Sequence, residues 1–315
     1  MSLLKASPIK SSQTAADDPR IGQLLGDSVD EKNATPKVAI IGFPSDEGVK
    51  RNGGRPGASQ APDAIRKQFY KMTPPADSYE LFVDLLKNSI DVGNVQITGD
   101  VEADQQVLGK VVAGFLEQNI VPIILGGGHE TAFGHFSGYT EAGLKTSIFN
   151  LDAHTDVRPL KDGKAHSGSP FRQAIEHESD CYEQYFVAGL QSHSVAKSHL
   201  DFIKNNNGRC LFRDETNITS ISGFFSEHNS DRLMVTFDMD AVDQSQAPGV
   251  SAPCANGLPS DLWLTAAYLA GRNEKVASFD LSEVNPKFDR DNQTTKLGAL
   301  TVWNFLLGLS ERNAD

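Results

Sequence analysis

Short apolar runs alternate with longer amphipathic stretches from Lys37 to the end of the chain. The runs that predict strands are Val38–Gly42, Val121–Leu125, Ser147–Leu151, Tyr185–Leu190, Leu233–Phe237 and Val276–Leu281. The stretches that predict helices are Ala61–Tyr70, Asp104–Gln118, Ser194–Asn206, Ser260–Arg272 and Leu297–Leu307. Because strands that alternate with helices form parallel βαβ units, we expect an α/β fold with helices on both faces of the sheet.

The N-terminal segment, residues 1–36, has a different pattern. It is rich in Ser, Ala, Asp, Lys and Pro and shows little periodicity, apart from one short helix expected near Ile21–Leu25. We therefore predict a flexible N-terminal arm over residues 1–36. Residues 37–315 show no break in composition that would mark a second domain, so we expect them to form a single domain.

The composition narrows the classes of protein that the chain can belong to. The 315 residues carry a formal net charge of −12, which disfavours a nucleic-acid partner. The absence of a long apolar run predicts no membrane helix, and the N-terminus lacks the apolar core of a secretory signal. The three cysteines, Cys181, Cys210 and Cys254, are odd in number and lack Cys-x-x-Cys spacing. This favours a cytoplasmic protein without a disulfide framework or a thiolate zinc site.

Three segments place Asp or His directly after a predicted strand. They are Gly126–Glu130, Asn150–Asp156 and Phe237–Asp243. Because side chains alternate along an extended chain, Asp152, His154 and Asp156 would share one side of the second segment, as would Asp238 and Asp240 of the third. The carboxyl ends of parallel strands are also where ligands bind in open α/β sheets.

Such a group of carboxylates and imidazoles indicates a pair of divalent cations. Burying the charges without a partner would be very costly, and two cations resolve the conflict. Oxygen and imidazole ligands without sulfur suit manganese, although zinc, cobalt or nickel would also bind. Two adjacent ions can deprotonate a water molecule, and the hydroxide can attack an electrophilic carbon. Taken singly, each segment has an ordinary explanation as a turn, a helix cap or a magnesium site, but the three together are far more specific.

The segments resemble the signatures of the ureohydrolase (arginase-like) family over about residues 37–310. The resemblance extends to Asn52–Ala58, Ala247–Pro253 and Glu283–Pro286. It implies a three-layer α/β/α fold with a parallel sheet of about eight strands, two Mn²⁺ ions per chain and a homo-oligomer. It also implies that Glu283 faces the substrate and that Asp152 and Asp238 bridge the two ions. The implied ligands of one ion are His129, Asp152, Asp156 and Asp238, and those of the other are Asp152, His154, Asp238 and Asp240.

The residues that flank these ligands bear on the substrate. Arginases and agmatinases carry a proton-shuttling His before a Gly that aligns with Gly168, and here Ser167 occupies that position, with His166 beside it. Arg158 stands two residues after Asp156, where a guanidinium would disfavour a cationic tail and bind a carboxylate. Arg172 and Arg55 are weaker candidates for the same role. An ordinary surface or ion-paired arginine is the alternative for each.

Within the family, the segments are most similar to those of formimidoylglutamases. These enzymes hydrolyse N-formimidoyl-L-glutamate, a small molecule with two carboxylates, to L-glutamate and formamide in histidine degradation. The proton for the leaving amine could come from Asp156, His166 or water. The alternatives are another amidinohydrolase, such as a guanidino-acid hydrolase or an agmatinase, and a catalytically silent regulatory paralogue, against which the complete ligand set argues.

Overall fold

A single mixed sheet runs through the computed structural model, which describes residues 4–5, 17–26 and 37–312. Within these residues the sheet has nine strands in the order β1-β3-β2-β4-β9-β8-β5-β6-β7. All neighbouring pairs are parallel except β1 with β3. The strands are β1 (Leu4–Lys5), β2 (Val38–Gly42), β3 (Ser89–Val95), β4 (Val121–Leu125), β5 (Thr146–Leu151), β6 (Tyr182–Leu190), β7 (Arg209–Phe212), β8 (Leu233–Asp238) and β9 (Val276–Ser282).

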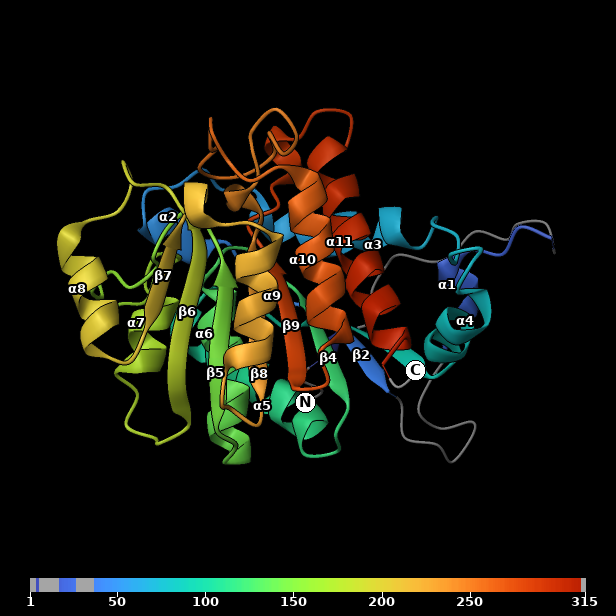
Figure 1. Cartoon of the computed structure of the whole chain (residues 1–315), viewed down its shortest axis with the longest axis horizontal. Coiled ribbons are helices and arrows are strands. Elements are labelled where there is room, and N and C mark those ends of the chain that lie inside the picture. The colour runs from blue at the N-terminus through green and yellow to red at the C-terminus, as the bar shows by residue number, and fades with distance from the viewer. Residues whose placement is uncertain (1–3, 6–16, 27–36, 313–315) are drawn as a thin grey trace.

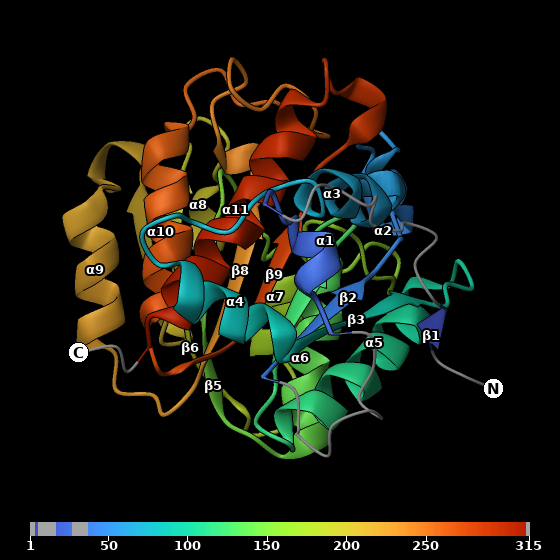
Figure 2. The same cartoon turned by 90° about the vertical axis from the view of Figure 1, so that its right-hand side faces the viewer.

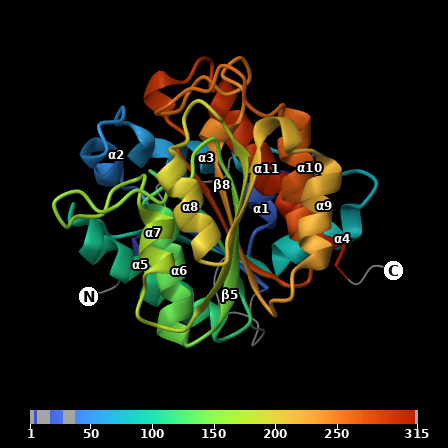
Figure 3. The ribbon, with the colours of Figure 1, turned by 60° about the vertical axis from the view of Figure 1, so that its left-hand side comes forward.

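Helices cover both faces of this sheet, so the expected three-layer α/β/α fold is confirmed (Figure 1). Figure 3 shows α5, α6 and α7 on one side of the sheet and α9, α10 and α11 on the other. The α-helices of the described chain are α1 (Ile21–Leu24), α2 (Glu47–Arg51), α3 (Ala61–Phe69), α4 (Tyr79–Lys87), α5 (Val101–Leu116), α6 (Thr131–Ala142), α7 (Pro170–Ile175), α8 (Lys197–Asn205), α9 (Ile218–Glu227), α10 (Ser260–Arg272) and α11 (Gln293–Ser310).

Each face of the sheet has its own apolar core, because successive strand residues point to opposite sides. On β8, Leu233, Val235 and Phe237 join the core under α10 and α11, whereas Met234 joins the core under α5 and α6. Strand β8 therefore contributes apolar residues to both faces, as expected for a covered parallel sheet.

The predicted elements all appear, and the structure adds several that the sequence pattern did not indicate. The additional strands are β1, β3 and β7, and the additional helices are α2, α4, α6, α7 and α9. The expected number of about eight parallel strands corresponds to β2 to β9, and β1 is a two-residue antiparallel addition at the edge.

The expected short helix in the N-terminal segment is confirmed as α1, which lies next to α4 (Figure 2). Ile21 is fully buried, and its backbone N–H donates to Met72 O at 2.9 Å. Residues 17–26 are thus packed on the domain rather than free. Most of the predicted flexible arm over residues 1–36 lies outside the described residues, so its flexibility stays a prediction. Among the described residues, no helix is both long and apolar enough to cross a membrane.

The fold brings four strand ends to one place. β4, β9, β8 and β5 are neighbours at the centre of the sheet, and the Asp- and His-bearing segments follow three of them. Glu283 follows the fourth, β9. Segments that are more than a hundred residues apart in the sequence therefore meet at one edge of the sheet.

Candidate metal centre

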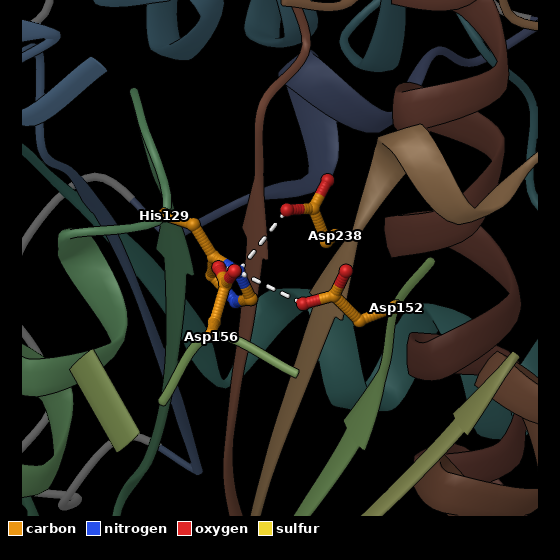
Figure 4. Close-up of side chains that lie close together, drawn as sticks. All are labelled: His129, Asp152, Asp156 and Asp238. Carbon is orange, nitrogen blue, oxygen red and sulfur yellow. Dashed lines mark hydrogen bonds and ion pairs between the residues drawn. The ribbon is translucent and has the colours of Figure 1, made fainter. Parts of the chain in front are cut away.

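Four of the predicted ligands form a tight, buried group. The ligand atoms of His129, Asp152, Asp156 and Asp238 all lie within 4.8 Å of one another. His129 Nδ1 is 2.9 Å from Asp156 Oδ2, 3.1 Å from Asp238 Oδ2 and 3.3 Å from Asp152 Oδ2 (Figure 4). An imidazole nitrogen and three carboxylate oxygens thus point at a common centre.

A second group shares one member with the first. Asp152, His154 and Asp240 also place their ligand atoms within 4.8 Å of one another. His154 Nδ1 lies 3.2 Å from Asp240 Oδ2 and 3.6 Å from Asp152 Oδ1. Asp152 belongs to both groups, which is the arrangement expected of a bridging carboxylate. Asp238 belongs only to the first group in this structure, and its bridging role stays a prediction.

Local turns, rather than the alternation of side chains along a strand, bring these side chains together. Asp152 Oδ1 accepts from His154 N at 2.7 Å, and Asp238 Oδ1 accepts from Asp240 N at 2.8 Å. Asp156 has a φ of +44°, in the left-handed region that residues other than glycine rarely adopt. The expectation of an extended segment was therefore wrong for the residues after β5, although the side chains meet as expected. These hydrogen bonds orient the two carboxylates so that Oδ2 of Asp152 and Oδ2 of Asp238 both face His129 Nδ1.

The electrostatics of the two groups show an excess of negative charge. Burial, with the charges of Asp240 and Asp152, raises the pKa of Asp238 well above its ordinary value. Burial likewise raises the pKa of Asp156, with the charge of Asp152 adding to it. The charge of Asp240 raises the pKa of His154 despite the opposing effect of burial. Each of these three shifts favours bound protons, so these groups attract positive charge. Burial alone would raise the pKa of Asp152, but its hydrogen bonds with His129 and His154 hold that pKa below its ordinary value.

The residues fit divalent cations. Asp240 Oδ1 is buried and has no hydrogen-bond partner among the residues that the structure describes. Such an atom is costly unless a ligand contacts it. The donors are carboxylate oxygens and imidazole nitrogens, a set that suits Mn²⁺ and related ions.

A cavity of about 290 Å³ opens next to the cluster and joins it to the residues expected to bind substrate. Asp156, Asp240 and Glu283 line it, together with Arg158 and Ser167. Arg158 Nη1 donates to Asn52 Oδ1 at 3.1 Å, and Asn52 Nδ2 donates to Ser167 Oγ at 3.1 Å. The sequence pattern gave no role to Asn52, although it begins one of the segments that carry the family resemblance.

Glu283 contacts both the cluster and the cavity. Its Oε1 accepts from His129 N at 2.9 Å, and its Oε2 makes no hydrogen bond to the described residues. Burial raises the pKa of Glu283 to about 7, and the charge of Asp240 contributes. Its φ of +64° is left-handed, a strained conformation of the kind found at functional sites.

Two residues expected at the site lie elsewhere. His166 is buried with Nε2 at 3.1 Å from Pro159 O, its Nδ1 accepts from Gly168 N, and it does not line the cavity. Arg172 does not line the cavity either. Arg172 Nη2 pairs with Glu176 Oε1 at 2.7 Å, and its guanidinium lies over the ring of Phe202.

Arg55 lines the cavity, but its guanidinium is already engaged. Its Nε donates to Ser251 O at 3.1 Å and its Nη2 donates to Val250 O at 2.5 Å. The group also lies over the ring of Phe288. Arg158 is therefore better placed than Arg172 or Arg55 to meet a substrate carboxylate.

Comparisons with known proteins identify a family that this chain matches along most of its length. The arginase family model matches residues 36–308. A formimidoylglutamase of Rhodococcus opacus is 39% identical over 275 residues, which cover 82% of each chain. A formimidoylglutamase of Geobacillus kaustophilus is 36% identical over 290 residues, 88% of this chain and 85% of the relative.

Solved structures show the same similarity in three dimensions. The formiminoglutamase of Trypanosoma cruzi with Mn²⁺ has a TM-score of 0.84 at 27% identity, covering 94% of this chain and all of that one (100%). The formimidoylglutamase of Bacillus subtilis has a TM-score of 0.85 at 25% identity, covering 96% of this chain and 95% of that one. The chain described here therefore belongs to the arginase family.

Proposed function

We propose that this chain is a manganese-dependent hydrolase that converts N-formimidoyl-L-glutamate to L-glutamate and formamide in the cytoplasm. One observation carries the proposal: a single cavity joins the buried carboxylate–imidazole cluster to the guanidinium of Arg158. The names of the relatives support the same activity. The substrate fits the cavity in charge, because an amidinium head would face carboxylates and a carboxylate tail would face an arginine.

In this proposal the two groups hold one Mn²⁺ ion each. His129, Asp156 and Asp238 would serve the first ion, His154 and Asp240 the second, and Asp152 both, with Asp238 as a second bridge. When bound, the ions supply an activated water nucleophile and positive charge opposite the negative charge that develops during the reaction.

The protein's own residues orient the substrate. Glu283 presents a buried carboxylate oxygen to the cavity, and this oxygen can accept from the N–H groups of an amidinium. Arg158 can donate to a substrate carboxylate through its other N–H groups while Asn52 accepts from Nη1. These two contacts would fix both ends of the substrate and present its formimidoyl carbon in one orientation.

Protonation of the leaving amine falls to a group that lines the cavity. His166 does not reach the cavity in this structure, whereas Asp156 does. Of the three proton sources that the sequence left open, Asp156 and water therefore remain. In this proposal Ser167 binds substrate at the cavity wall, where its hydroxyl also accepts from Asn52 Nδ2.

A guanidino-acid hydrolase is the second candidate, because Arg158 would also bind the carboxylate of a guanidino acid. Steady-state kinetics of the Mn²⁺-loaded protein on formimidoylglutamate, guanidinobutyrate, agmatine and arginine separates the two. We expect the highest kcat/KM on formimidoylglutamate. A higher value on guanidinobutyrate would replace the proposed substrate, and a higher value on agmatine would contradict the role of Arg158.

A further inference from the structure

A stripe of polar side chains runs along the buried strand β9. Ser278, Asp280 and Ser282 are each fully buried, and their spacing places them on one face of the strand. Phe279 and Leu281 lie on the opposite face, in the apolar core under α10 and α11. Covered parallel strands are normally apolar on both faces. A buried carboxylate in such a strand is costly unless hydrogen bonds or a charged partner compensate for the lost water.

Helix α6 partners the stripe. His135 and Tyr139 lie one helical turn apart on α6, and both are fully buried. His135 Nδ1 is 2.7 Å from Asp280 Oδ2, and its Nε2 is 2.5 Å from Ser278 Oγ. Tyr139 Oη is 2.5 Å from the same Ser278 Oγ. The carboxylate of Asp280 is thus held in place from the α6 side.

The network ends at a residue of the metal centre. Thr236 lies on β8, next to β9 (Figure 1), and its Oγ1 donates to Asp280 Oδ1 at 2.9 Å. His129 Nε2 lies 3.0 Å from the same Thr236 Oγ1. A hydroxyl has a single proton. Because Thr236 gives that proton to the carboxylate, it can only accept a hydrogen bond from His129 Nε2–H.

This direction determines the chemistry of the opposite ring nitrogen. When Nε2 carries the proton, the neutral imidazole keeps the lone pair of Nδ1 free. Nδ1 is the atom that faces Asp152, Asp156 and Asp238. The hydrogen bond from Nε2 therefore fixes both the tautomer and the rotation of a ring whose other side is a ligand atom.

We infer that Thr236 and Asp280 are positioning residues that hold His129 ready to bind a metal ion, with His135 securing Asp280. The arrangement is a carboxylate–histidine pair of the kind that supports metal-bound imidazoles, extended here by one hydroxyl. The inference rests on the proposed metal centre. It also explains why three polar residues occupy a strand that the rest of the sheet would make apolar.

Three substitutions separate this role from ordinary packing. Thr236→Val keeps the shape of the side chain and removes the hydroxyl, whereas Thr236→Ser keeps the hydroxyl. Ser282→Ala is the matched control, because Ser282 Oγ also donates to Asp280 Oδ1, at 3.2 Å, but forms no hydrogen bond with His129 in the part of the chain that the structure describes. Asp280→Asn is a second perturbation in case Thr236→Val does not fold, which circular dichroism would reveal.

The measurement is Mn²⁺ binding, followed by the electron paramagnetic resonance signal of free Mn²⁺ during titration. We expect Thr236→Val and Asp280→Asn to weaken one of two Mn²⁺ sites by about ten- to hundred-fold. Thr236→Ser and Ser282→Ala should stay within about three-fold of the unchanged chain. In a His129→Ala background, Thr236→Val should weaken Mn²⁺ binding no further, because its effect acts through His129.

Two results would overturn the inference while leaving the proposed function intact. One is that the Thr236→Val and Asp280→Asn variants fold and bind two Mn²⁺ ions as tightly as the unchanged chain does. The other is an equal loss of affinity from Thr236→Val with and without His129. If the unchanged chain itself bound no Mn²⁺, the metal centre would be refuted and this inference with it.

Discussion

Replacing Arg158 by alanine tests how the protein selects its substrate. The change removes the guanidinium that lines the cavity and leaves the cluster of carboxylates and imidazoles untouched, because Arg158 is in neither group. The Mn²⁺ content should therefore be unchanged. What should fall is the enzyme's binding of the transition state when the substrate carries a carboxylate.

The size of the loss follows from the surroundings of Arg158. A hydrogen bond to a charged group contributes about 1.5–3 kcal/mol. Arg158 is exposed at the cavity rim, and solvent weakens such contacts. We therefore expect the lower part of the range, about 1.5–2 kcal/mol, which corresponds to about a ten- to thirty-fold lower kcat/KM.

The assay compares two substrates and two variants. The kcat/KM of Arg158→Ala should fall on formimidoylglutamate and stay nearly unchanged on a formimidoyl amine without carboxylates. Arg172→Ala is the control, since Arg172 pairs with Glu176 and does not line the cavity. Its kcat/KM should remain within about two-fold on both substrates.

Either of two results would refute the reasoning. If Arg158→Ala kept its activity on formimidoylglutamate within about two-fold, the guanidinium would be an ordinary surface group. If activity fell equally on both substrates, Arg158 would act on the chemistry or the fold rather than on the carboxylate.

Other predictions concern the metal ions, the cavity loop and the N-terminal segment. Asp152→Asn should lose both Mn²⁺ ions and Asp240→Asn only one, by elemental analysis, because Asp152 belongs to both groups. Burial raises the pKa of Asp46, but the Gly57 N–H hydrogen bond and Lys50 hold it below its ordinary value of 3.8. The stability that this depressed pKa contributes is present above about pH 4 and is lost at lower pH. Asp46→Asn should therefore lower the melting temperature at pH 7 and have progressively less effect as the pH falls below about 4; an equal effect throughout would contradict this. Deleting residues 1–26 should lower the free energy of unfolding by about 2–4 kcal/mol, because it removes the buried side chain of Ile21. Denaturant unfolding measures this loss, and steady-state kinetics should show that kcat/KM is retained.

The parts of the fold that the sequence predicted are those with a repeating apolar pattern. Helix α10 has the predicted bounds, because Trp263, Ala266, Ala267 and Ala270 recur at helical spacing and are buried. Strand β3 was not predicted, because Asp91 interrupts its apolar residues.

A distant residue makes that strand possible. The buried guanidinium of Arg66 on α3 donates to both carboxylate oxygens of Asp91 and to Gly93 O.

Helix α6 was missed for a similar reason. It contains Gly134 and Gly138, which disfavour an isolated helix. A Cβ at Gly138 would lie 2.3 Å from Val112 Cγ1 of α5, so close packing of the two helices requires the glycine.

The site residues that lie in short segments rich in Asp and His could be predicted. Side chains whose direction depends on the conformation of a loop could not. Carboxylates and histidines after apolar strands indicated the cluster, because strand ends of a parallel sheet meet. The choice between His166 and Ser167 depended on a turn, in which His166 bonds to Pro159 O and Ser167 to Asn52. For Arg172, the glutamate four residues later was an available sign of an ion pair on a helix.

In the proposed reaction the chain hydrolyses the bond between the formimidoyl carbon and the glutamate nitrogen. Nuclear magnetic resonance of the products, formed from formimidoylglutamate by the Mn²⁺-loaded protein, tests it most directly. We expect equal amounts of L-glutamate and formamide, with no reaction in the Asp152→Asn variant. N-formylglutamate and ammonia as products, or no turnover by a protein that holds two Mn²⁺ ions, would contradict it.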